Sequence, residues 1–117
     1  MPTSQERPDV HTRADLDRHD GQPVAVVGDY AAVARPRKGR PDPEAPRDHA
    51  TVKLADGTRV YLEPIDGATA TRSSEERGRC EGKQVRVTGV ARRVMPATGA
   101  GLLAPCIEHV RSVEVIE

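Results

Sequence analysis

The segment His49-Ala-Thr-Val-Lys-Leu-Ala-Asp-Gly-Thr-Arg-Val-Tyr-Leu-Glu-Pro64 contains two short runs of alternating apolar and polar residues, one on each side of Asp56-Gly57. Such alternation around Asp-Gly is typical of a β-hairpin with a type I′ turn, which needs positive φ at both central positions. Side chains alternate between the two faces of a strand. The expected inner face is apolar and consists of Val52, Leu54, Val60 and Leu62. The expected outer face is mostly polar and consists of Thr51, Lys53, Arg59, Tyr61 and Glu63.

The composition favours an all-β domain with a small aliphatic core. The chain has 117 residues, of which 36% are hydrophobic, and it contains neither Phe nor Trp. A chain of this length forms one domain around one core. Val is stiff at χ1 and favours strands, while ten Gly and ten Pro favour short strands joined by tight turns. We therefore expect a single β domain with a core of Val, Leu, Ile and Ala.

The charge balance and the absence of certain motifs argue against several classes of protein. Eighteen basic residues balance eighteen acidic ones, so the whole molecule lacks the positive field of a dedicated nucleic-acid binder. No apolar run is long enough to cross a bilayer and no signal-peptide pattern is present, so a cytoplasmic protein without membrane contact is expected. Cys80 and Cys106 lie outside any CxxC or Cys/His cluster, which indicates free thiols and neither a metal nor a cofactor.

The chain before the hairpin divides into an arm, a strand and a loop. Residues 1–20 carry almost no apolar side chains, which predicts a flexible arm, and the domain itself is expected over 21–117. A strand is predicted over 22–34, where the apolar phase slips by one residue. A bulge near Val27-Gly28 would absorb this slip. Residues 35–48 are expected to form a proline-broken basic loop.

The chain after the hairpin predicts one helix and two further strands. Two serines before two glutamates, with a glycine further along, indicate a short helix over 72–82. Residues 83–94 alternate until Gly89, which predicts a strand that bends at this glycine. A loop over 95–106 leads to a last strand over 107–116. The predicted order is strand, long loop, hairpin, short helix, strand, loop and strand.

This order resembles the OB-fold, a five-stranded Greek-key barrel, here with one short helix between strands three and four. Three segments carry the resemblance: Gly21-Gln-Pro-Val-Ala-Val-Val-Gly28, the Val52-Lys-Leu-Ala-Asp-Gly-Thr58 hairpin, and Gly82-Lys-Gln-Val-Arg-Val-Thr-Gly89. The third segment is similar to the Gly-Lys-x-Val-x-Val-x-Gly opening of the fourth strand in many bacterial OB domains. The resemblance covers residues 21–116 and implies architecture, not activity. Another small barrel, such as an SH3-like one, is the alternative and would not require the helix.

The resemblance implies a ligand face on the outer side of the second and third strands, flanked by two loops. On this face a tyrosine ring would stack a base while the neighbouring cations hold phosphates. The expected partner-face residues are Lys53, Arg59, Tyr61, Arg35, Arg37, Lys38, Arg40, Arg92 and Arg93.

Two functions from different classes fit these expectations. The first is a protein-interaction module or assembly subunit, in which the apolar pair Leu102-Leu103 of the last loop docks onto a protein partner. The alternative is binding of single-stranded nucleic acid through the predicted face and the basic loop 35–47. An enzyme is not expected, because the spacing of the histidines and carboxylates does not place an acid and a base in one pocket.

Overall fold

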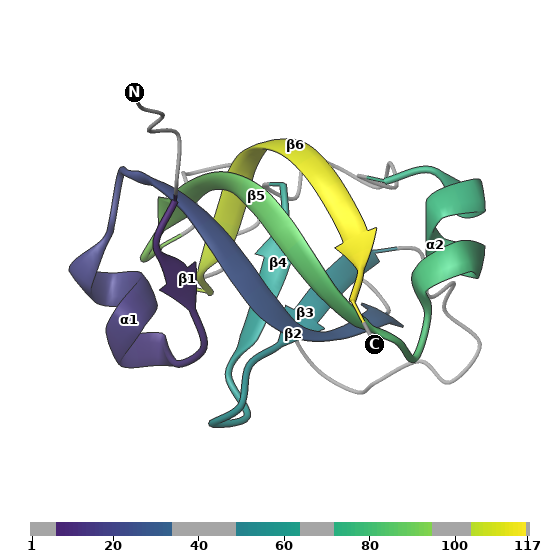
Figure 1. The fold of residues 1–117 in the computed structure, drawn as a ribbon, viewed down its shortest axis with the longest axis horizontal. Helices are drawn as coiled ribbons and strands as arrows, with labels where there is room; N and C mark the ends of the chain where they lie inside the picture. The colour runs from purple at the N-terminus through teal and green to yellow at the C-terminus, as the bar shows by residue number, and fades with distance from the viewer. Residues whose placement is uncertain (1–6, 34–48, 64–71, 95–103, 117) are drawn as a thin grey trace, which may run out of the picture.

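The computed structural model describes residues 7–33, 49–63, 72–94 and 104–116, which form a mostly β structure with two short helices (Figure 1). The elements in chain order are β1 (Asp9–Val10), α1 (Arg13–Arg18), β2 (Pro23–Val33), β3 (His49–Lys53), β4 (Arg59–Leu62), α2 (Ser74–Cys80), β5 (Gln84–Arg92) and β6 (Cys106–Val115). The two helices lie at opposite ends of the sheet in the view of Figure 1.

The strands form one sheet that closes into a ring. The order is β1-β2-β3-β4-β6-β5, and β5 also pairs with β2. Strands β4 and β6 run parallel through Tyr61↔Cys106 and Leu62↔Ile107, whereas the other ring contacts are antiparallel. All five predicted strands are present. The count of five is nevertheless wrong, because β1 adds a sixth strand that runs parallel to β2.

The core lies inside the ring and is aliphatic. The predicted inner face of the hairpin is confirmed, since its four side chains are 0–3% exposed and belong to one buried cluster. Val24 and Val26 of β2 and Val85 and Val87 of β5 join this cluster. The alternation of apolar residues therefore predicted correctly which side of β3 and β4 turns inward.

Strand β2 serves two sides of the ring. Its first part, from Pro23 to Asp29, pairs with β5, and its last part, from Asp29 to Val33, pairs with β3. The bulge predicted at Val27-Gly28 is wrong, because both of these registers run without a shift. Gly28 has a packing role instead: a Cβ there would lie 2.6 Å from Val52 Cγ1 and closer still to the carbonyl oxygen of Lys53. The strand crosses β3 at a distance that only glycine allows.

The register shift between β5 and β6 lies at Gly89, where the bend was predicted. A Cβ at Gly89 would lie 2.8 Å from the carbonyl oxygen of Glu108. The extra residues are on β6, in which His109 adopts a φ of 53°. The glycine thus makes room for a bulge in the neighbouring strand.

The hairpin between β3 and β4 has a longer turn than predicted. Leu54 N–H donates to the carbonyl of Thr58 at 2.7 Å, and Gly57 N–H donates to the carbonyl of Leu54 at 2.9 Å. Gly57 has a φ of 90°, whereas Asp56 does not have positive φ. The turn is therefore not type I′ but a three-residue loop that ends in a left-handed glycine.

The prediction of a flexible arm over 1–20 is wrong for residues 7–20, while residues 1–6 lie outside the described part. Val10 of β1 and Leu16 of α1 are fully buried in the main core. The Thr12 side chain caps α1 by accepting from Asp15 N–H at 3.2 Å. The segment is tied to the hairpin turn by a hydrogen bond from Ala55 N–H to the carbonyl of His11 at 3.0 Å. Two apolar side chains are thus enough to dock this segment, because the barrel offers a surface on which they can be buried.

The predicted helix is present as α2. Ser73 caps it by accepting from Glu76 N–H at 3.1 Å, as the serine and glutamate pattern indicated. The Tyr30 side chain of β2 is fully buried and contacts this helix through a hydrogen bond to Glu76. Helix α2 is therefore attached to the barrel by a polar contact as well as by Cys80, which lies in the core.

Candidate functional site

The structure describes five of the predicted site residues. The four loop cations and the apolar pair lie outside the described residues; these are Arg35, Arg37, Lys38, Arg40, Leu102 and Leu103. The described members are Lys53, Arg59, Tyr61, Arg92 and Arg93. Strands β3, β4 and β5 carry the first four of them, and Arg93 follows β5 directly.

Lys53 and Arg59 form the centre of the outward face of the hairpin. They lie directly opposite each other on β3 and β4. Lys53 is exposed and Arg59 is half-buried. Arg59 Nη1 donates to Thr51 Oγ1 at 2.9 Å, and that hydroxyl in turn donates to the carbonyl of Ala31 at 2.7 Å. Thr51 thereby holds the guanidinium on the outward face beside the lysine.

Two like charges directly opposite each other on neighbouring strands destabilise a sheet. In the described part of the chain, Lys53 and Arg59 have no ion pair with a carboxylate to relieve this repulsion. An anion bound between them would do so. The pair is thus suited to bind a phosphate or another anionic group.

The prediction that Tyr61 is an exposed stacking platform is wrong. Tyr61 is on the outward face, as predicted, but it is only 9% exposed because it packs against Cys106, Val33 and Ala104. Burial raises the pKa of its phenol, and the nearby Arg59 partly offsets this rise. The covering residues come from β2, β6 and the residues just before β6, so the alternation within the hairpin contained no sign of them.

Arg92 is not a free cation, whereas Arg93 is bound to the rest of the fold through its backbone. The Arg92 guanidinium forms an ion pair with the Glu108 carboxylate of β6, which neutralises its charge. Arg93 is exposed; its N–H donates to Asp20 Oδ1 at 2.7 Å, and its carbonyl accepts from Arg13 Nη2 at 3.2 Å. The register still places Arg92 on the outward face, because Arg92 pairs with Cys106, the partner of Tyr61.

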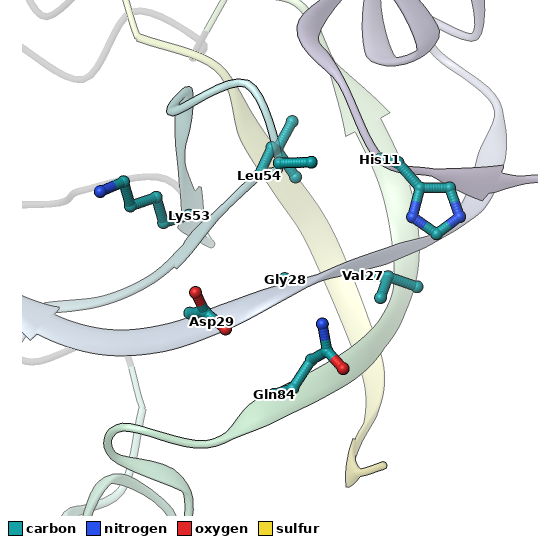
Figure 2. Close-up of a pocket in the computed structure, with 8 residues that line it drawn as sticks. His11, Val27, Gly28, Asp29, Lys53, Leu54 and Gln84 are labelled. Carbon is teal, nitrogen blue, oxygen red and sulfur yellow. The ribbon is translucent and has the colours of Figure 1, made fainter. Parts of the chain in front are cut away.

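The structure shows a pocket beside Lys53 that sequence reasoning missed (Figure 2). Its volume is about 280 Å³. Its lining residues are His11, Val27, Gly28, Asp29, Lys53, Leu54, Ala55 and Gln84. These residues come from β2, β3, β5, the hairpin turn and the segment after β1. His11 was assigned to a flexible arm, so its place at this pocket could not be expected.

The described residues show three further properties. Within the described ranges, no group of three or more His, Cys, Asp or Glu side chains is placed to hold a metal ion. Both cysteines are buried free thiols, and burial raises the pKa of Cys106 to about 12. In the same ranges, neither helix has the length and apolar character that a membrane crossing requires.

Comparisons with known proteins show similarity at the level of the fold. No protein-family model matches the sequence, and no curated protein matches it. A solved structure of U. maydis Replication protein A bound to ssDNA is similar, with a TM-score of 0.50 and 16% sequence identity. The alignment covers 98% of this chain and 77% of that chain. The likeness is one of fold and is consistent with an all-β, OB-like barrel.

Proposed function

We propose that this protein is a non-catalytic module that binds single-stranded nucleic acid across the outward face of β3 and β4. The observation that carries the proposal is the direct opposition of Lys53 and Arg59 on that face. A phosphate between the two side chains would replace a cross-strand repulsion by two attractive contacts. Arg59, already oriented by Thr51, would hold the phosphate in a defined position.

The fold supports this placement. Within the ring, β2 to β6 occupy the positions of the five strands of an OB-like barrel, and α2 lies between the third and fourth of them. OB domains bind oligonucleotides on the face of their second and third strands, which correspond here to β3 and β4. The similar solved structure is that of a protein bound to ssDNA.

The burial of both tyrosines decides the kind of binding. Tyr30 is 0% and Tyr61 is 9% exposed, and the chain contains no other aromatic residue of the Phe, Tyr or Trp type. Stacking of bases on tyrosine therefore contributes little, and contacts between cations and phosphates supply most of the affinity. We expect binding with little sequence preference along most of the strand and a marked dependence on salt.

The protein-interaction function has no support among the described residues, because Leu102 and Leu103 lie outside them. The two functions differ in their response to salt. Binding of a phosphate backbone weakens at high salt because the release of counterions from the strand then gains less free energy. Docking through two leucines depends little on ionic strength. A salt titration thus tests the proposal against its alternative.

The test measures the anisotropy of a labelled 15-nucleotide oligothymidylate between roughly 50 and 200 mM NaCl. For single strands, the slope of log K against log salt changes by about 0.7 for each phosphate contact. Lys53→Ala and Arg59→Ala should each make the slope shallower by about this amount. The matched control is Arg86→Ala on β5, where the arginine forms a half-exposed ion pair with Asp9. Absence of binding, or unchanged slopes in both variants, would falsify the proposal.

A further inference from the structure

The pocket beside Lys53 lies where β2 changes its partner along one edge. Val26 is the last residue of β2 that pairs with β1, and Asp29 is the first that pairs with β3. The two residues between them, Val27 and Gly28, pair with β5 on the other edge. On the edge of β2 that faces the pocket, Val27 and Gly28 pair with no residue of the described strands. The pocket is therefore a gap in the strand pairing that the fold itself creates.

Two residues of opposite charge lie at one end of this gap. Asp29 on β2 lies directly opposite Lys53 on β3. In the part of the chain that the structure describes, neither the Asp29 carboxylate nor the Lys53 ammonium takes part in a hydrogen bond or ion pair. Figure 2 shows the lysine side chain extending away from Asp29, with His11 at the other end of the pocket. The carboxylate and the ammonium at this end of the pocket are therefore both available to a ligand.

We propose that this pocket is a guanine-selective subsite of the single-strand interface. The Watson–Crick edge of guanine carries two adjacent N–H donors beside the O6 acceptor. A carboxylate offers two acceptor oxygens, so Asp29 can accept from N1–H and N2–H while Lys53 donates to O6. Cytosine and adenine each offer the carboxylate only their exocyclic amino group, and thymine offers it only N3–H. Guanine therefore makes the most hydrogen bonds with this pair of side chains.

The subsite rests on the proposed function, because Lys53 belongs to both surfaces. Asp29, Lys53 and Arg59 form one row across β2, β3 and β4. Two strand spacings of about 4.8 Å place the ends of the row about 10 Å apart. One nucleotide can bridge this distance, with its phosphate between Arg59 and Lys53 and its base edge at Asp29. The Lys53 ammonium has three donors, so it can contact both the phosphate and O6. His11 supplies a ring at the pocket, and histidine rings stack on unpaired bases.

The experiment compares four 15-nucleotide thymidine strands that differ only at the central position, which holds thymine, cytosine, guanine or hypoxanthine. Hypoxanthine lacks the N2 amino group but is otherwise guanine. We expect the guanine strand to bind at least about fivefold more tightly than the other three. Asp29→Asn replaces one acceptor by a donor and should remove the difference between guanine and hypoxanthine. Asp29 is exposed, so this variant should melt at the wild-type temperature.

The control variant is Glu114→Gln, which removes an exposed carboxylate from β6 and should leave the guanine preference unchanged. The results separate this inference from the proposed function. Equal affinity for all four strands, with salt slopes that still depend on Lys53 and Arg59, would overturn the subsite and leave the interface standing. A guanine preference that persists in Asp29→Asn would also overturn the subsite. Absence of binding to every strand would overturn both.

Discussion

The hydroxyl of Tyr30 donates a hydrogen bond to Oε2 of Glu76, 2.9 Å away, although 46 residues separate the two in sequence. Glu76 also accepts from Arg72 Nη2 at 2.7 Å, and the same arginine lies 3.7 Å from the Glu63 carboxylate. This network joins α2 to the wall of the barrel through β2 and the end of β4. Since Tyr30 is fully buried, its hydroxyl depends on Glu76 for a partner.

We predict that Tyr30→Phe lowers the free energy of unfolding by about 1.5–3 kcal/mol, the usual contribution of a hydrogen bond to a charged group. Because the ring remains in place, the decrease in the free energy of unfolding measures the contribution of the hydroxyl alone. Urea denaturation of wild type and variant measures the difference. A variant as stable as wild type would show that the contact with Glu76 contributes nothing net.

Stability should fall in acid because of the same carboxylate. Burial raises the pKa of Glu76, but the hydrogen bonds from Arg72 and Tyr30 outweigh this effect and leave the pKa below its ordinary value of 4.5. A pKa that is lower in the folded protein stabilises it above the unfolded value, and this stabilisation is lost as the pH falls through the folded value. The pKa values of Asp15 and Asp56 are lowered too, mainly by backbone hydrogen bonds from His11 and Arg13 respectively.

Denaturation midpoints between pH 7 and pH 3 test this expectation. The wild type should hold its stability down to about pH 4.5 and lose it below, where the carboxylates become protonated. Glu76→Gln should be less stable at pH 7 and show a shallower decline in acid, since it cannot be protonated. Parallel curves for the two proteins would contradict the role assigned to Glu76.

Local patterns predicted much of this fold. The hairpin, the capped helix α2 and the strands β2, β5 and β6 follow from alternation, capping residues and glycines, all of which act over a few residues. The docking of residues 9–18 could not be predicted in this way. Val10 and Leu16 are buried only because the finished barrel offers them a surface, and the segment around them is too polar to signal this.

In the candidate site, too, local patterns predicted some features, whereas others depend on contacts between distant segments. The alternation within one hairpin predicted that Lys53 and Arg59 share its outward face, and the register places them directly opposite each other. The burial of Tyr61 depends on its pairing with Cys106, 45 positions later in the chain. The pocket likewise joins His11, Asp29 and Gln84 from separate elements. Contacts between distant segments leave no periodic trace in the sequence.

Tyr61→Ala should therefore damage the protein, contrary to what an exposed ring would imply. Removal of a buried aromatic side chain lowers the free energy of unfolding by about 3–5 kcal/mol. The loss here should be near the lower end of this range, because Tyr61 packs in a small cluster outside the main core. Tyr61→Phe keeps the ring and serves as the control, with stability close to wild type. Thermal melting compares the three proteins.

A second measurement on Tyr61→Ala locates the damage. The Cys106 thiol packs against Tyr61 and its pKa is raised by burial to about 12, so alkylation of native wild type should be very slow. In Tyr61→Ala, Cys106 should be alkylated faster, while Cys80 in the main core stays protected. Mass spectrometry of the labelled peptides distinguishes the two thiols. Equal acceleration at both would indicate global unfolding instead of local exposure.

The Glu63 carboxylate holds the β6 bulge. Its Oε1 accepts from the N–H of His109 at 3.1 Å and its Oε2 from the N–H of Val110 at 2.9 Å. Glu63 itself has a φ of 76°, a region that favours glycine. At this strained position the Glu63 side chain satisfies two backbone donors.

Two substitutions separate the carboxylate from the strain. Glu63→Ala loses both hydrogen bonds and keeps the strained backbone, so we expect it to lower the free energy of unfolding by about 1–3 kcal/mol. Glu63→Gly loses the same bonds but relieves the strain, so it should be less destabilised than Glu63→Ala. In both variants hydrogen exchange at the Val110 amide should accelerate. If Glu63→Gly proved as unstable as Glu63→Ala, the positive φ would carry no cost, and the carboxylate alone would account for the stabilisation at this position.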